Sequence, residues 1–269
     1  LWRSIIFSDD DFHGTDLEVG LKNKKKKLTT VCRMADRIAV NSKFLAQKLL
    51  DNIAGADQEK VVIINPSPAD FFFIPKPAEE LKHLKAELAL EGKKVLLTVA
   101  RLEDGKGYPH LLHVLPDILK KVPNTVLVII GDGPKKKLIL EQIQKNNLQN
   151  CVRFLGNIPY NELPKYYQVA DVFVLLTHKD EEREEGWGTV FLEAGASGLP
   201  VVAGRAGGVG EVVENLQTGV VVDVLQTQAV FSAITELLLR PDFARQMGST
   251  GLQRARNEFT WDKQLTKLV

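Results

Sequence analysis

The chain has 269 residues, of which 44% are hydrophobic and 26% charged, a composition typical of globular proteins. Its 35 basic and 34 acidic residues leave a net charge of +1, so no overall field favours nucleic acid as a partner. No apolar run approaches the roughly 20 residues that a membrane-spanning helix needs. The two cysteines, Cys32 and Cys151, lack the spacing of metal ligands, which favours reduced thiols and a cytoplasmic location.

The first part of the chain predicts a small α/β unit. Strands are expected at residues 3–8, 36–42 and 60–66, and helices at 17–35 and 42–53, the second capped by Ser42. Three strands cannot bury both faces of a doubly wound sheet, so this unit is predicted to be incomplete. A stretch rich in proline and acid follows at 67–80 and is the predicted linker. We therefore predict a partial N-terminal Rossmann-like α/β domain with its linker at residues 1–75.

From residue 94 onward, short apolar runs alternate regularly with helix-length amphipathic segments. Continuous apolar strands separated by helices are typical of a parallel sheet covered on both faces. Right-handed crossovers then predict a complete, doubly wound, Rossmann-like C-terminal domain at residues 76–269. The expected strands are 94–102, 124–133, 151–156, 171–178, 200–204 and 218–223, and the main expected helices are 108–122, 135–148, 161–170, 189–198, 227–240 and a last region from about 242.

Ligands of open α/β sheets bind beyond the carboxyl ends of the strands, so the residues directly after each strand are the first candidates for a binding site. Arg101 and Lys106 follow the first strand of the second domain, across a glycine-bearing turn. Two cations in this position are suited to a diphosphate, and ordinary surface charges are the alternative. The turn at 131–134, Gly-Asp-Gly-Pro, resembles a nucleotide-binding turn but lacks the full G-x-G-x-x-G pattern, so a plain tight turn is equally compatible.

The stretch 179–189 reads KDEEREEGWGT and precedes an apolar helix. Its two glycines, Gly186 and Gly188, let backbone amides approach a ligand closely, and the helix beginning near Thr189 points its positive end at the same place. Glu185 is followed eight positions later by Glu193. We predict that 179–184 is a solvated rim and that Glu185 is the functional carboxylate. A glycine-rich, flexible turn is expected at 205–211.

The ordered set of segments resembles the GT-B glycosyltransferases, specifically the large retaining family 4. The segments are VARLEDGKGY, VIIGDGP, VRFLGNIP, ADVFVLLTH, EGWGTVFLEAGASGLPVVAG and GGVGEVVENLQTGVVVD. Glu185 and Glu193 meet the E-x7-E signature, with Trp187 in place of the usual phenylalanine. The resemblance covers residues 94 to about 262, and the segments 35–49 and 61–72 resemble the end of the family's N-terminal, acceptor-binding domain. Roughly a hundred residues of that domain are expected to be missing from the chain, whose final helix, from Phe259, is expected to cross back onto it.

The resemblance implies roles for the residues at the donor diphosphate. Arg101 and Lys106 would bind the diphosphate and neutralise the departing nucleotide, so that no metal ion is required. The amides of Gly188 and Thr189 would cap phosphate oxygens.

It also implies how the rest of the donor is bound. Glu193 would bind the ribose hydroxyls, and Glu185 would contact the sugar near its anomeric centre. The stretch after the third strand, with Leu155, Asn157 and Ile158, would border the base.

His13, in the sequence FHGT, resembles the family's Phe-His-Gly element, whose histidine projects toward the reacting sugar. The match departs from the family because Asp9, Asp10 and Asp11 stand between the strand and the histidine. A loop histidine without a role is one alternative. A metal-binding aspartate cluster is the other, and it is disfavoured because three adjacent residues cannot all point at one ion from a strand.

The predicted function is metal-independent transfer of a sugar from a nucleotide-diphosphate donor, such as a UDP- or GDP-sugar, to an acceptor hydroxyl with retention of configuration. The donor is a substrate, so no cofactor is expected, and the acceptor is a glycan, a lipid or a small molecule. A truncated, non-catalytic nucleotide-sugar-binding remnant is the alternative. A nicotinamide-dependent dehydrogenase is disfavoured because no G-x-G-x-x-G follows any strand.

The strongest local charge feature is a lysine run in the first predicted helix, formed by Lys22, Lys24, Lys25, Lys26 and Lys27. A solvated helix face explains it without function. Contact with anionic lipid headgroups is the functional alternative, which would make the protein peripheral on the inner face of the membrane.

Overall fold

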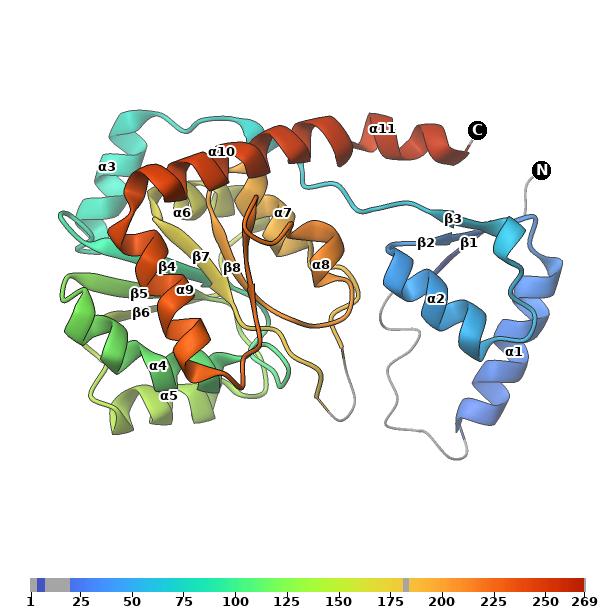
Figure 1. The fold of residues 1–269 in the computed structure, drawn as a ribbon, viewed down its shortest axis with the longest axis horizontal. Coiled ribbons are helices and arrows are strands. Elements are labelled where there is room, and N and C mark those ends of the chain that lie inside the picture. Colours follow the sequence, from blue (N-terminus) through green and yellow to red (C-terminus); the bar gives the residue numbers. More distant parts are fainter. Residues whose placement is uncertain (1–3, 8–19, 181–183, 269) are drawn as a thin grey trace.

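The computed structural model describes residues 4–7, 20–180 and 184–268. Within these residues the strands form two parallel sheets, one with the order β1-β2-β3 and one with the order β6-β5-β4-β7-β8-β9. Figure 1 shows the two sheets side by side, with the C-terminal helices running along one side of both. The α/β, doubly wound fold predicted for the second part of the chain is confirmed.

The smaller sheet consists of β1 (Ser4–Phe7), β2 (Arg37–Val40) and β3 (Val61–Ile63). Two helices, α1 (Gly20–Met34) and α2 (Lys43–Asn52), connect its strands. Its apolar cluster joins one face of β2 to both helices and includes Cys32, Ile38, Leu45 and Leu49. The predicted helix cap is confirmed, because the Ser42 hydroxyl accepts a hydrogen bond from the Leu45 amide at 3.0 Å.

The larger sheet packs against an apolar cluster on each face, and its strands are apolar at most positions, as is typical of parallel strands. Leu96 and Leu97, adjacent in β4, belong to different apolar clusters, one on each face. The strands are β4 (Lys94–Val99), β5 (Thr125–Ile130), β6 (Val152–Gly156), β7 (Val172–Leu175), β8 (Val201–Gly204) and β9 (Gly219–Val222).

Helices cover both faces of this sheet. One face packs against α4 (Tyr108–Lys121), α5 (Lys136–Lys145) and α9 (Thr227–Leu239). The other face packs against α3 (Ala78–Glu87), α6 (Leu163–Val169) and α7 (Thr189–Ala196), and α10 (Pro241–Glu258) lies against α7. Two short helices, α8 (Val209–Val212) and α11 (Trp261–Leu265), complete the described helices that matter for the site.

The segment predicted to be a linker is packed. Residues Asp70–Phe73 form a 3-10 helix whose Phe72 is fully buried in a core cluster of the larger sheet. Helix α3 follows directly and was not predicted, although Leu81, Leu84 and Leu88 carry the spacing of a helical apolar face. The division into domains at residue 75 stays a prediction.

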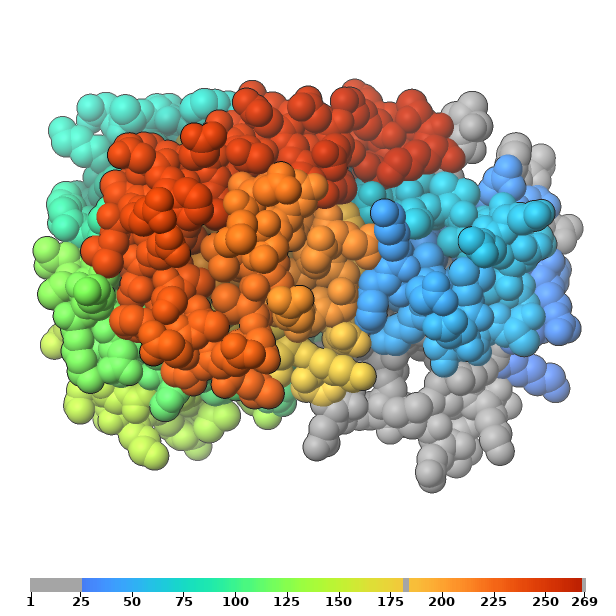
Figure 2. Space-filling view, in the orientation of Figure 1, coloured from blue at the N-terminus to red at the C-terminus, as the bar shows by residue number. Residues whose placement is uncertain are grey.

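The C-terminal helices cross from the larger sheet to the smaller one, as the resemblance implies (Figures 1 and 2). Beyond α10, the Gln264 side chain of α11 is buried and accepts a hydrogen bond from the Asn65 amide at 2.9 Å, just after β3. Along the described residues, no helix combines the length and apolar character needed to cross a bilayer.

Candidate functional site

The candidate site lies at the edge of the larger sheet where its strands end. Because the paired strands are all parallel, the loops after β4, β5, β7 and β8 emerge at this one edge. The predicted site residues that the structure describes lie in these loops, at the end of β6 and in α7. The tertiary structure brings two of them into direct contact.

Lys106 and Glu185 form an ion pair. Lys106 follows β4 and Glu185 follows β7, and their Nζ and Oε2 atoms lie 2.7 Å apart. Both side chains are largely buried, with 23% of Lys106 and 11% of Glu185 exposed, so this pair is better shielded from solvent than an ordinary surface pair. The predicted diphosphate-binding cation and the predicted sugar-facing carboxylate are therefore partners before any ligand is bound.

The loop that carries Lys106 is fixed by its glycines. Gly107 adopts φ +73° as the N-cap of α4, and a Cβ there would lie 2.0 Å from the Leu176 carbonyl oxygen. The Gly105 carbonyl accepts a hydrogen bond from the His178 amide at 2.9 Å. The loops after β4 and β7 therefore touch through their backbones, and this contact places Lys106 next to Glu185.

Arg101 belongs to the same loop but lies nearer to solvent. Its side chain is 67% exposed and its Nε lies 3.4 Å from Glu103 Oε2. The structure thus places Arg101 at the predicted edge without joining it to the Lys106–Glu185 pair. Its long, exposed side chain has the freedom to turn toward an incoming anion.

The N-terminus of α7 lies directly after the 184–188 loop. Gly188 adopts φ +83°, where a Cβ would press into the Phe191 ring at 2.6 Å, and no side chain caps this helix end. Thr189, the first helical residue, is half-buried. Amides at an uncapped helix N-terminus are suited to an anion, which fits the predicted phosphate contact of Gly188 and Thr189.

Glu193 lies one turn into α7 and is buried, with 4% of its surface exposed. Its Oε2 accepts a hydrogen bond from the Tyr167 hydroxyl at 2.8 Å. Burial raises the pKa of Glu193, and hydrogen bonds from Tyr167 and Tyr160 oppose this rise. Neither tyrosine was predicted, because nothing in the sequence spacing indicates that the side chains of Tyr160 and Tyr167 meet Glu193.

The predicted base-side residues lie at the end of β6. Leu155 and Ile158 are partly buried against a core cluster of the sheet, and Asn157 is exposed between them. Gly156 adopts φ +68° and its carbonyl accepts a hydrogen bond from the Gly131 amide at 2.8 Å, which ties this turn to the one after β5. An exposed amide flanked by apolar side chains is suited to the edge of a base.

The glycine-rich turn at 207–208 packs tightly against the 184–188 loop. The Gly208 amide donates to the Glu185 carbonyl at 2.9 Å, and the Gly207 amide donates to Glu184 Oε1 at 3.1 Å. A Cβ on either glycine would lie 2.0 Å from a backbone oxygen of Glu185 or Gly186. The interpretation of Glu184 as a solvated rim residue is therefore wrong: it is half-buried and holds this turn, which close packing fixes in place.

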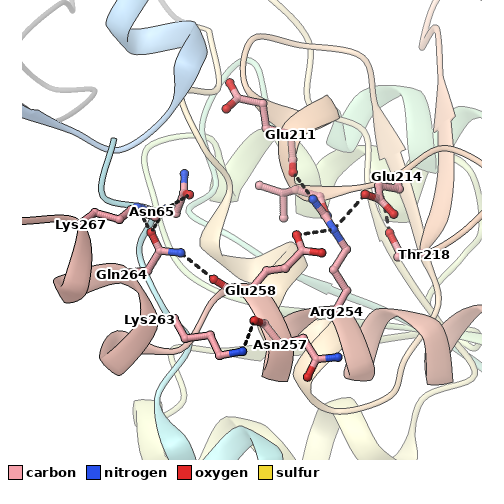
Figure 3. A network of polar contacts seen from close by, with 11 residues as sticks. Asn65, Glu211, Glu214, Thr218, Arg254, Asn257, Glu258, Lys263, Gln264 and Lys267 are labelled. Atoms are coloured by element: carbon pink, nitrogen blue, oxygen red, sulfur yellow. Dashed lines mark hydrogen bonds and ion pairs between the residues drawn. The ribbon is translucent and has the colours of Figure 1, made fainter. Parts of the chain in front are cut away.

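A crevice of about 680 Å³ lies at the junction of the two sheets. Figure 3 shows the polar network of its wall, in which Arg254 of α10 contacts Glu214 and Glu258, each at 3.1 Å. Trp187, buried and edge-to-face with Phe259, forms another part of the wall. The 184–188 loop thus has Lys106 on one side and the junction on the other.

Some expectations fall on residues that the structure does not describe. His13 and the aspartates at 9–11 lie outside the described residues. In the described part of the chain, no group of three or more histidine, cysteine, aspartate or glutamate side chains is arranged to hold a metal ion.

Comparison with known proteins identifies the family. The family described as "Glycosyl transferases group 1" matches residues 80–254, which include the loops of the candidate site. The chain belongs to the group 1 glycosyl transferases. Its six-stranded parallel sheet and its structural neighbours are those of the GT-B fold.

The curated relatives of this glycosyl transferase include enzymes with different named substrates. It is 35% identical to a GDP-mannose-dependent alpha-(1-6)-phosphatidylinositol monomannoside mannosyltransferase of Mycobacterium tuberculosis, over 73% of this chain and 51% of that protein. It is 29% identical to a D-inositol 3-phosphate glycosyltransferase of Corynebacterium efficiens, over 87% of this chain and 55% of that protein. The chain thus spans about half the length of the curated relatives it matches.

Solved structures share the fold. Anabaena HepE in complex with UDP superposes with a TM-score of 0.84 at 20% identity, covering 98% of this chain and 70% of that one. Sucrose-phosphate synthase from Thermosynechococcus elongatus superposes with a TM-score of 0.76 at 25% identity, covering 92% and 60%. At these identities the likeness establishes the fold.

Proposed function

We propose that the chain binds a nucleoside-diphosphate sugar at the edge of the larger sheet and takes part in transfer of that sugar to an acceptor hydroxyl. The observation that carries the proposal is the contact of Lys106 with Glu185 beside the uncapped N-terminus of α7. A cation, a carboxylate and a helix N-terminus meet there, which are the groups that a diphosphate linked to a sugar requires.

The donor diphosphate would lie between Lys106 and the start of α7. Lys106 pairs with Glu185, which stands three residues before Gly188 in the chain, so we propose that Lys106 and the amides of Gly188 and Thr189 share one anion, with Arg101 approaching from the solvent side. These groups would stabilise the negative charge that grows on the leaving nucleoside diphosphate, in a site partly shielded from water. On this proposal the protein's own cations do the work of a divalent metal ion.

The other parts of the donor follow from this placement. Glu193 would bind the ribose hydroxyls, which would compete with the hydrogen bonds that it receives from Tyr167 and Tyr160, and Leu155, Asn157 and Ile158 would border the base. Glu185 would turn from Lys106 toward the hydroxyls of the sugar. We further propose transfer with retention of configuration, in line with the family that the sequence resembles, and His13 as the histidine near the reacting sugar.

The named substrates of relatives support both a UDP- and a GDP-linked donor. The mycobacterial relative is named for GDP-mannose, and the HepE structure contains UDP. The mycobacterial relative is also named for a phosphatidylinositol monomannoside, and the Corynebacterium relative is named for inositol 3-phosphate. We therefore keep a glycan, a lipid or a small molecule as the proposed acceptor.

The experiment is a binding and turnover measurement on the full chain. Thermal shift across UDP, GDP, their sugars and NADH should show stabilisation by one family of nucleoside diphosphates, because a ligand of the native state raises its apparent stability. Absence of any response to nucleoside diphosphates, or a response to NADH alone, would contradict the proposal. Release of labelled sugar from a bound donor, to water or to an acceptor, then distinguishes an active transferase from a binding remnant.

A further inference from the structure

Glu211 of α8 holds the start of α2 across the junction of the two sheets. Its Oε2 accepts a hydrogen bond from the Lys43 amide and its Oε1 accepts one from the Phe44 amide, both at 2.8 Å. These are the first two amides of α2, which have no partner within the helix. One carboxylate thus satisfies two of them and places a negative charge at the positive end of the helix.

The backbone that presents Glu211 is itself anchored. Arg254 of α10 donates from Nη2 to the Glu211 carbonyl at 2.9 Å and from Nη1 to the Val212 carbonyl at 2.6 Å. Figure 3 shows the Arg254 guanidinium at the Glu211 backbone, between the carboxylates of Glu214 and Glu258. Helix α8 is therefore fixed to α10, and the Glu211 carboxylate of α8 binds the start of α2 in the smaller sheet's unit.

The turn that leads into α8 connects Glu211 to the donor site. Gly208 binds the Glu185 carbonyl through its amide, as described above. On its other side the same turn lies against α2, because a Cβ on Gly207 would lie 3.1 Å from the Phe44 ring and one on Gly208 would lie 3.5 Å from the Ser42 side chain. The 207–208 turn is thus wedged between the 184–188 loop and α2.

We propose that Glu211 is a positioning residue that couples the 184–188 loop to α2, so that a bound nucleoside diphosphate changes the hold on α2. This inference rests on the proposed function. A diphosphate that draws the Lys106 ammonium away from Glu185 would shift the 184–188 loop, whose Glu185 carbonyl accepts a hydrogen bond from the Gly208 amide. Because the 207–208 turn packs against this loop on one side and against α2 on the other, a shift of the loop would move the turn and, with it, Glu211, three residues after Gly208. The smaller sheet's unit is then positioned according to whether the donor site is filled.

The test follows the Lys43 and Phe44 amides by NMR in the full chain, with and without saturating UDP or GDP, while calorimetry reports nucleotide binding. In the wild-type protein the nucleotide should shift both amide resonances and change their hydrogen-exchange rates severalfold. Glu211→Ala should raise their exchange at least tenfold and abolish their response, although the nucleotide still binds. Glu211→Gln keeps the size of the side chain and one acceptor oxygen, so it should weaken the hold without unfolding the chain.

The matched control is Glu214→Gln, which alters the same Arg254 network without touching α2 and should leave the response intact. Nucleotide binding without any response at Lys43 and Phe44 would overturn the coupling and leave the proposed function standing. A response that persists unchanged in Glu211→Ala would overturn the role of Glu211. Failure of UDP and GDP to bind the wild-type chain would instead refute the proposed function and the inference with it.

Discussion

The Nζ atom of Lys106 lies 2.7 Å from the Oε2 atom of Glu185, although 79 residues separate them in the chain. The ion pair restrains both side chains in the unliganded site. The pair also sets a condition on binding, because a diphosphate and Glu185 compete for the same ammonium group.

Replacement of Glu185 by glutamine should therefore tighten binding of free UDP or GDP. The ion pair no longer has to be broken, and a partly shielded pair is worth about 1 kcal/mol, which corresponds to roughly fivefold in affinity. Free nucleoside diphosphates carry no sugar, so no sugar contact is lost. Calorimetry of Glu185→Gln against the wild type checks this, and weaker binding of the nucleoside diphosphate would show that Glu185 supports the diphosphate directly.

Replacement of Lys106 by alanine should selectively weaken the diphosphate. Loss of a hydrogen bond to a charged group costs about 1.5–3 kcal/mol, so UDP or GDP affinity should fall by one to two orders of magnitude. Affinity for uridine or guanosine should change little. Arg101→Ala should show the same selectivity with a smaller loss, since its side chain is more exposed. Equal losses for nucleoside and diphosphate would remove these residues from the phosphate site.

Glu193→Gln should raise the stability of the folded chain at neutral pH and weaken its binding of UDP or GDP. Burial raises the pKa of Glu193 above its unfolded value of about 4.3. The folded chain then binds this proton more tightly than the unfolded chain, so stability falls as pH rises from the unfolded to the folded pKa and stays lower above it. Glutamine carries no charge and still accepts from the Tyr167 hydroxyl, so the variant should gain stability at neutral pH.

Denaturant unfolding of Glu193→Gln and wild type from pH 4 to pH 8 measures this difference, which should vanish toward pH 4. The variant should also bind UDP or GDP more weakly by about 1–3 kcal/mol, through the weakened ribose contact. A stability difference that is the same at every pH would show that the carboxylate charge is not its source.

Gly207→Ala should lower both the stability of the chain and its nucleotide affinity, because Gly207 packs against Glu185 of the donor site. Gly207 adopts φ +43°, and the added Cβ would lie 2.0 Å from the Glu185 carbonyl oxygen. Forcing a methyl group into this contact costs about 1–3 kcal/mol of stability and displaces Glu185. Gly210→Ala is the control in the next turn of chain, because a Cβ there meets nothing within 4 Å. Equal melting temperatures and nucleotide affinities of the two variants would contradict the packing argument.

The lysines of α1 give a test of membrane contact, which stays a prediction. Lys26 and Lys27 are exposed, and each lysine near an anionic bilayer contributes about 1 kcal/mol. Lys26→Glu with Lys27→Glu should reduce co-sedimentation with phosphatidylserine vesicles but not with phosphatidylcholine vesicles. The control is Lys120→Glu with Lys121→Glu, an exposed pair on α4. Equal effects of the two double variants would show only a general charge effect.

The parallel sheet and its ligand edge were predictable because their signals are local. Short apolar runs such as 125–130, alternating with helix-length segments, are typical of strands buried on both faces, and the loops after parallel strands share one edge of the sheet. Helix α3 was not predicted because the prolines before it, Pro75 and Pro77, are typical of a linker, although its leucines have helical spacing. Ser42 was predictable as a cap, since capping involves residues three positions apart.

The sequence by itself determined the fold class and which loops carry the candidate site. Only the tertiary structure decided which side chains meet: Lys106 with Glu185, Tyr167 with Glu193, and Glu211 with the start of α2. The physical reason is range. Strand and helix formation depends on neighbours a few residues apart, whereas hydrogen bonds and ion pairs depend on distances of about 3 Å between segments that only the packed fold brings together.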